Sequence, residues 1–340
     1  KQFAADGNRK RVENDTRRVA FVTEPMVRAQ PSAPWISGKP AAIQAVRKLF
    51  GTADYQAYAG VYTGGANGVY WLEVLAATPE LAYVRNLHSS GKHQIEPIET
   101  HIESALIYPL LRAGDIGRWQ AQPSAHILMV QDIQTRSGYE PDWLQAQHPH
   151  AAAYLAQFEP LLRRRAAFKR YFQPTAAYYT MFDVGPYSFA PLKVVWRGMG
   201  ARRMHAAVVS TQDNKPIMPN QAVHPFVPLA ATDTDEAYYL AACLNSAPFE
   251  FAVLSQTQEG GQSFAQPGIL KQLRVPRYNA VDDAHREMSR LGRAAHDHAA
   301  DADALATIEQ DLTHASAAIW HLTTTELQDV LDSLAEIQYD

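Results

Sequence analysis

Cysteine is almost absent from this chain of 340 residues, which contains only Cys243. A single cysteine excludes an intramolecular disulfide framework and any zinc or iron–sulfur site that needs several cysteines. No apolar run approaches the ~18 residues of a membrane span, so we expect no membrane protein and a cytoplasmic location. The chain starts at Lys1 without a charged-then-apolar leader. We therefore expect no secretory signal, and a fragment or processed product.

The sequence also lacks the short motifs of common catalytic sites. It has no phosphate loop, no Gly-x-Ser-x-Gly elbow, no Asp/Asn-Pro-Pro-aromatic loop of amino-methyltransferases and no Glu-x-Lys of metal-dependent nucleases. A strand-like run at 194–196 precedes Gly198 and Gly200, but Arg203 stands at the third glycine position of a dinucleotide fingerprint. We expect no catalytic residue and no cofactor in this chain.

Metal-ligand patterns are equally incomplete. The His-x-His pairs at 148–150 and 296–298 have no third ligand at metal spacing, and their side chains diverge on a helix. The His-x-Glu at 101–103 lacks the paired cysteines of zinc deaminases. We expect no metal, and Cys243 is interpreted as a small core residue rather than a nucleophile.

Charge is segregated along the chain, although the net charge is only −4. Residues 161–205 carry nine Lys and Arg residues against one acid, Asp183, which gives +8. Residues 281–340 carry thirteen acids against three arginines, which gives −10. This asymmetry is expected when one face meets a polyanion; the alternative is a solvated helix face at 163–170.

Apolar spacing predicts an α+β fold: a body with mixed strands, followed by a helical, acidic tail. Its expected strands flank a glycine turn at 63–68, and the helix at 233–245 is expected to be capped by Thr232 or Thr234. The predicted helices cover residues 41–50, 103–112, 150–171, 233–245 and 281–299, and the predicted strands include 126–130, 193–196 and 205–209.

The tail has its own pattern. Ile308, Leu312, Ala315, Ile319 and Leu322 form a narrow apolar seam, and Thr323-x-x-Glu326 is the signature of a capping box for the next helix. Such a seam predicts packing on one partner helix, most simply that at 281–299 or one in another part of the protein. The alternative is that the tail completes the core of the preceding domain.

Four segments resemble, in the same order, the target-recognition domain of large restriction-modification adenine-N6 DNA methyltransferases. The segments are Tyr58–Trp71 with its Thr-Gly-Gly-Ala-Asn-Gly run, Ile102–Ile116 with Leu-Ile-Tyr-Pro-Leu-Leu-Arg-Ala-Gly-Asp-Ile, Tyr238–Ser246 with the following Gly260-Gly261 and Leu-x-x-Leu-x-Val-Pro, and Ile308–Glu326. The resemblance covers residues 55–335. It implies an N-terminal linker and short helix at 1–50, a target-recognition domain at 51–280 and a helical spacer or docking segment at 281–340.

The resemblance implies sequence-specific recognition of double-stranded DNA by the C-terminal half of a type II restriction-modification enzyme of the bifunctional type. The S-adenosylmethionine cofactor and the catalytic methyltransferase half, or subunit, would lie outside this chain. One alternative is a stand-alone DNA specificity subunit, similar to those of type I systems, that docks on separate catalytic subunits. A second alternative is a nuclease of unfamiliar type.

Candidate DNA contacts follow from side-chain chemistry, because Arg, Asn and Gln read base edges and Lys and Arg bind phosphates. The base-reading candidates are Asn67, Arg85, Asn86, Arg202, Arg203, Gln262 and Ser263. The phosphate candidates are Arg163, Arg164, Arg165, Lys169, Arg170, Lys193 and Arg197. Residues of the resembling segments for which we expect a structural role are Gly60, Thr63, Gly64, Gly65, Gly68, Arg112, Asp115, Asn245 and Ser246.

Overall fold

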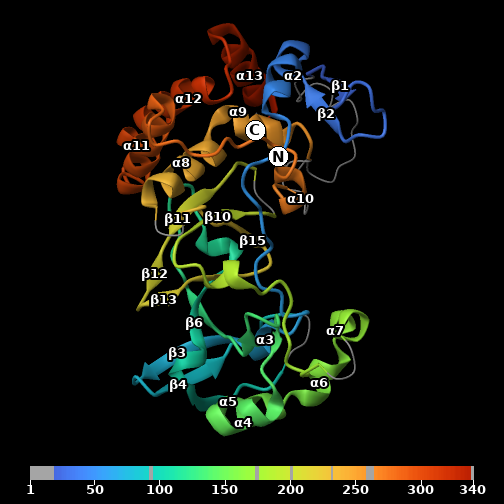
Figure 1. The fold of residues 1–340 in the computed structure, drawn as a ribbon, viewed down its shortest axis with the longest axis vertical. Helices are drawn as coiled ribbons and strands as arrows, with labels where there is room; N and C mark the ends of the chain where they lie inside the picture. The colour runs from blue at the N-terminus through green and yellow to red at the C-terminus, as the bar shows by residue number, and fades with distance from the viewer. Residues whose placement is uncertain are drawn as a thin grey trace, which may run out of the picture.

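The computed structural model describes residues 19–91, 95–172, 176–199, 202–230, 233–257 and 264–337. Its helices and strands form an elongated α+β molecule with two lobes (Figure 1). We call the lobe built on the six-stranded sheet the sheet lobe, and the lobe that contains the long C-terminal helices the helical lobe. A three-stranded sheet lies between them (Figure 1).

The sheet lobe is formed by six strands in the order β14-β6-β7-β3-β4-β5. These are β3 (Trp71–Ala77), β4 (Leu81–Asn86), β5 (Glu99–Glu103), β6 (Ile107–Leu111), β7 (Ala125–Leu128) and β14 (Met218–Pro219). All neighbours are antiparallel except β14 and β6. Alternating burial along β4 shows that one face of the sheet is covered.

Short helices pack on that face and at its edge, and a separate apolar core forms between them and the sheet. The helices are α3 (Asn67–Tyr70), α4 (Pro141–Gln147), α5 (Pro149–Ala156), α6 (Glu159–Arg164) and α7 (Ala166–Tyr171). Tyr70, Leu72, Val84 and Leu155 are fully buried in this core. Three of these helices begin with proline at the first turn, where a missing N–H costs nothing. The prediction of helix over 150–171 is confirmed.

The central sheet has the order β11-β10-β15, with β10 (Lys193–Arg197), β11 (Ala206–Val209) and β15 (Val223–Phe226) all antiparallel. Two-stranded ribbons complete the strands: β1 (Val22–Pro25) with β2 (Trp35–Gly38), β8 (Gln131–Asp132) with β9 (Ser137–Gly138), and β12 (Thr211–Gln212) with β13 (Lys215–Pro216). The strands predicted at 193–196 and 205–209 are thus confirmed.

The helical lobe contains α2 (Pro40–Val46), α8 (Thr234–Asn245), α9 (Ala247–Leu254), α10 (Pro267–Leu270), α11 (Asp283–Asp297), α12 (Ala302–Ile319) and α13 (Thr324–Ile337). The seam of α12 packs mainly on α11, as predicted, and also on α9. The capping box is present: Glu326 N–H donates to Thr323 Oγ1, and Thr323 N–H donates to the Glu326 carboxylate.

Three local predictions are wrong. Residues 103–112 were expected to be helical, but β6 takes most of them because Ile107–Leu111 pairs with β7. The glycine run does not connect two hairpin strands: Gly64 and Gly65 have φ of +70° and +90°, and the turn leads into α3. The cap of α8 is Asp233, whose carboxylate accepts the N–H groups of Asp235 and Glu236.

The apolar cores follow the lobes rather than the predicted domain limits. Residues of α11, α12 and α13 share one continuous core with α2, α8, α9 and β10. The segments 1–50, 51–280 and 281–340 remain a prediction about domains, but residues on both sides of position 280 build the same core. In addition, α13 packs directly on α2, far away in sequence (Figure 1).

Candidate nucleic-acid interface

Exposed basic side chains gather on α6 and α7 at the edge of the sheet lobe. Arg163, Arg164, Lys169 and Arg170 are all exposed, at the C-terminal ends of two short helices. The Arg163 guanidinium pairs with Glu159 at 2.7 Å, and Arg170 lies over the ring of the exposed Tyr171. Four cations and an exposed aromatic ring on two consecutive helices suit contact with phosphates.

Arg165, in the same run, does not fit the phosphate role predicted for it. Its side chain is buried, and its guanidinium donates to the carbonyl oxygens of Thr63, Tyr178 and Thr180 at 2.7–2.8 Å. A phosphate cannot reach these donors unless the contacts break. Arg165 instead ties the glycine turn to the segment that follows α7.

Lys193 is the second phosphate candidate that the structure contradicts. Its side chain is 1% exposed, and Nζ donates to the carbonyl oxygens of Ala190 and Ile217. Burial without an acidic partner lowers the pKa of Lys193 to about 7. Arg197, at the end of the same strand, is half-buried, and its Nε donates to the Met199 carbonyl.

The base-reading candidates occupy two separate places. Arg85 is exposed on β4 and pairs with Glu99 and Glu73, at 2.6 and 3.2 Å. Arg202 and Arg203 are exposed in the segment before β11, at the helical lobe. The structure therefore does not bring the predicted readers into one cluster.

The base-reading role predicted for Asn86 is also wrong, and Asn67 bonds within its own turn. Asn86 is 1% exposed; its amide nitrogen donates to the Glu96 carbonyl and its amide oxygen accepts the Ile98 N–H. Both ends of this amide are occupied, so it shapes the loop instead of reading a base. Asn67 opens α3 and accepts the Thr63 hydroxyl. Gln262 and Ser263 lie outside the described residues.

An open hollow of about 640 Å³ lies beside α6, next to the exposed cations. Its floor includes the apolar side chains of Ile95, Phe158 and Leu161, and Gln157 and Glu96 stand in its lining. An amide and a carboxylate can together donate to and accept from base edges. Gln157 and Glu96 were not predicted from the sequence, because an isolated Gln or Glu in a predicted loop or helix carries no signal.

The glycines and polar residues of the resembling segments have structural roles. A Cβ on Gly60 would lie 2.1 Å from the Asn220 carbonyl oxygen, so only glycine fits there. Asp115 accepts the Arg112 N–H and the Ser124 hydroxyl, which closes the turn after β6. The Asn245 side chain makes a pair of bonds to the backbone of Ala206, and Ser246 Oγ donates to the Cys243 carbonyl. Thr63, Gly64, Gly65 and Gly68 lie in the turn and first residues of α3.

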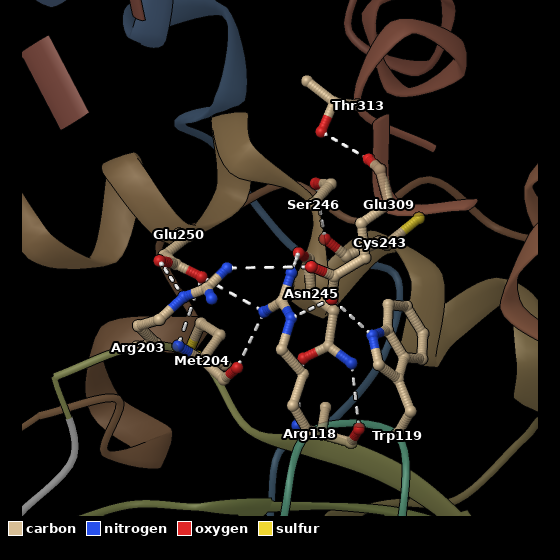
Figure 2. A network of polar contacts seen from close by, with 11 residues as sticks. Arg118, Trp119, Arg203, Met204, Cys243, Asn245, Ser246, Glu250, Glu309 and Thr313 are labelled. Atoms are coloured by element: carbon tan, nitrogen blue, oxygen red, sulfur yellow. Dashed lines mark hydrogen bonds and ion pairs between the residues drawn. The ribbon is translucent and has the colours of Figure 1, made fainter. Parts of the chain in front are cut away.

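An ion-pair network joins the two lobes and was not foreseen (Figure 2). Arg118, on the connection between β6 and β7, reaches Glu250 on α9 and Glu309 on α12. Arg203 contacts the same two carboxylates, at 3.4 and 4.0 Å. Burial alone would raise the pKa of Glu309, but Arg118, the Trp119 N–H and Arg203 outweigh it and lower that pKa. Glu250 is 1% exposed, so this charge depends on its partners.

His296 and the cysteine have packing roles, and the start of α5 at His150 is held through its backbone. His296 Nε2 accepts the Val208 N–H and Nδ1 lies 2.7 Å from the Gly292 carbonyl, which leaves the ring no ligand position. Glu103 accepts the N–H groups of His150 and Ala151 at the start of α5. Burial raises the pKa of Cys243 to about 12. Within the described ranges, no group of three metal-ligating side chains occurs and no helix is long and apolar enough to cross a membrane.

A nucleotide cofactor does not fit the strand–glycine segment. Along the described chain β10 is followed by the antiparallel β11, whereas a dinucleotide fingerprint leads from its strand directly into a helix. A Cβ on Gly198 would lie 2.1 Å from His224 Nε2, so this glycine is needed for packing.

Comparison with solved structures identifies a protein of similar fold. The structure of the type IIL restriction-modification enzyme MmeI in complex with DNA matches 85% of this chain with a TM-score of 0.51 and 10% identity. The type IIG restriction endonuclease BpuSI matches 65% of the chain with a TM-score of 0.33 and 11% identity. The chain spans 37% and 27% of those two proteins. No family model and no curated protein matches the sequence. The similarity to MmeI shows a shared fold over most of this chain.

Proposed function

We propose that this chain recognises double-stranded DNA as the sequence-reading part of a restriction-modification adenine-N6 methyltransferase whose catalytic part lies elsewhere. The observation that carries the proposal is the fold shared with MmeI over 85% of the chain, because that enzyme was solved in complex with DNA. The four resembling sequence segments point to the same class of enzyme independently of the coordinates.

The surface of the sheet lobe supports this proposal physically. Arg164, Lys169 and Arg170 are exposed, and within the described residues their side chains form no ion pair. Phosphate binding thus requires no prior breaking of a salt bridge at these three positions. The neighbouring hollow offers Gln157 and Glu96 to base edges.

The helical lobe has the opposite character along its last helices. Asp303 and Asp311 on α12 and Asp332 on α13 are exposed acids. Phosphates are repelled from such a surface. In this proposal DNA meets the sheet lobe and the junction of the lobes, and the acidic helices face away from it.

The proposal is tested with the full chain and a pool of random duplexes. We expect selection to enrich one sequence motif, with binding that weakens steeply as salt rises. Replacing Arg164, Lys169 and Arg170 by alanine should weaken binding to all sequences alike and lower the slope of log K against log salt by about 3.

The matched control replaces Arg286 and Arg290 by alanine. These exposed arginines pair with acids on their own helix, at the acidic end of the molecule, and their loss should leave DNA binding unchanged. If no motif is enriched, or if the control variant weakens binding as much as the triple variant, the proposal is wrong.

A further inference from the structure

The connection between β6 and β7 leaves the lobe to which it belongs. β6 and β7 are adjacent strands of the six-stranded sheet, but Trp119 between them is 1% exposed and lies in the core of the helical lobe. Its backbone has a φ of 68°, a left-handed conformation that is unusual for a bulky side chain. The local backbone strain is offset by the burial of the indole in the other lobe.

Trp119 is also held by polar contacts. Its N–H donates to the Ala206 carbonyl at 3.1 Å, and its indole Nε1 donates to Glu309 Oε1 at 2.6 Å. The ring lies edge-on to His296, with the ring centres 5.5 Å apart. Contacts from β11, α12 and α11 therefore hold one residue contributed by the sheet lobe.

Arg118 spreads its guanidinium over three further segments of the helical lobe (Figure 2). It donates to the carbonyl of Asn245, the last residue of α8, at 2.6 Å and to the Met204 carbonyl at 2.9 Å. It also pairs with Glu250 at 3.2 Å and with Glu309. A cation at the free carbonyls of a helix C-terminus is favourable, and the fork of donors matches several acceptors at once.

We propose that Arg118 is a positioning residue for DNA recognition, because it fixes the orientation of the sheet lobe relative to the helical lobe. This inference rests on the proposed function, in which exposed cations of α6 and α7 and the Arg202–Arg203 segment contact one duplex from two lobes. Sequence reading by both requires a constant angle between them, since a displacement of about 1 Å already weakens directional contacts.

Arg203 extends the ion-pair network of Arg118 to the surface of the protein. It shares both carboxylates with Arg118, but its own side chain is 48% exposed. Loss of Arg118 would give Arg203 a larger share in neutralising Glu250 and Glu309 and draw it toward them. The Arg118 side chain, 14% exposed, thus determines both the angle of the lobes and the freedom of an exposed base-reading candidate.

The orientation is measured without DNA, on the full chain, by pulsed electron paramagnetic resonance. Spin labels are placed on cysteines introduced at Glu80, between β3 and β4, and at Ala306 on the exposed side of α12, in a Cys243→Ala background. We expect one narrow distance distribution for the parent and a broadened or shifted one for Arg118→Ala. The matched control is Arg112→Ala on the same connection, because Arg112 bonds to Ser124 and Asp115 within its own lobe.

A second arm uses the duplex enriched from the random pool and a scrambled duplex. Arg118→Ala should lower the ratio of the two affinities about tenfold and leave the affinity for scrambled DNA within about twofold, because its phosphate contacts remain. Arg112→Ala should keep the parent ratio. If Arg118→Ala does not fold, Arg118→Lys retains the charge but cannot reach all four acceptors, and the same effects are expected in weaker form.

A narrow parental distance in the Arg118 variants overturns the inference, and so does a broadened distance with an unchanged affinity ratio. If the parent shows no sequence preference at all, the proposed function fails. The distance measurement then still decides whether Arg118 holds the lobes together.

Discussion

Deleting residues 281–340 should leave a chain whose helical lobe cannot fold, because the three C-terminal helices complete the core of that lobe. Nine large apolar side chains after position 280 are buried in that core. They are Met288, Leu291, Leu312, Ile319, Trp320, Leu322, Leu327, Val330 and Leu334.

The magnitude follows from burial. At about 1.5 kcal/mol for each side chain, the nine contribute about 14 kcal/mol, comparable to the whole stability of about 5–15 kcal/mol of an ordinary protein. Even if half of this apolar area is buried among the three helices themselves, the remaining contribution of about 7 kcal/mol is comparable to the free energy of unfolding of an ordinary protein. Deletion would also uncover α2 and α9, which pack against α13.

The assay compares the full chain with residues 1–280 by near-ultraviolet circular dichroism and urea unfolding. We expect the fragment to lose the aromatic signal of buried tryptophans and to show no cooperative transition for the helical lobe. A fragment with a native-like spectrum and a cooperative transition would refute the reasoning and favour a tail that folds apart as a spacer.

A point substitution gives the same test without deletion. Leu312 is 1% exposed, so Leu312→Ala should lower the free energy of unfolding by about 2–5 kcal/mol. Leu229 is 51% exposed, and Leu229→Ala should change it by less than about 0.5 kcal/mol. Equal effects at the two positions would contradict the burial argument.

Three further predictions concern single side chains. Arg165→Ala should cost about 3 kcal/mol or more in urea unfolding, because buried carbonyls lose their donors, whereas Arg164→Ala should cost less than about 0.5 kcal/mol. Asp233→Ala should cost about 1 kcal/mol through loss of the α8 cap, and Thr234→Ala should cost much less. Lys193 has a folded pKa of about 7 against an ordinary 10.5, so the unfolded chain binds the extra proton between these values. Relative to Lys193→Met, the stability of the parent should therefore rise from pH 7 toward pH 10 by up to about 1.4 kcal/mol per unit.

Elements with a strong local signal were predictable from the sequence. The capping box before α13 and the seam of α12 are local patterns, and both form as expected. β6 was not predictable, since an apolar run of five residues fits a helix and a buried strand equally well. The segment becomes a strand because it pairs with β7 and β14, and its own sequence does not reveal these pairing partners.

For the candidate site, the sequence predicted the positive charge of the segment but not which of its side chains are exposed. Counting cations found the basic segment, but composition does not separate Arg164, which is exposed, from Arg165, which is buried one position later. In the turn between α6 and α7 the chain directs Arg165 inward, where carbonyl oxygens take the place of water. Burial at the level of a single residue is decided by tertiary packing.

Three residues that belong to the resembling segments, or lie next to one, meet at the junction of the lobes. Asn245 and Glu309 come from two of the resembling segments, and Arg118 follows a third by two residues. All three belong to the network that joins α8, α12 and the β6–β7 connection. Under the proposed function, these three residues belong to a frame that holds the two lobes at a fixed angle. We then expect the target sequence to depend on exposed side chains elsewhere, such as Gln157 in the hollow beside α6.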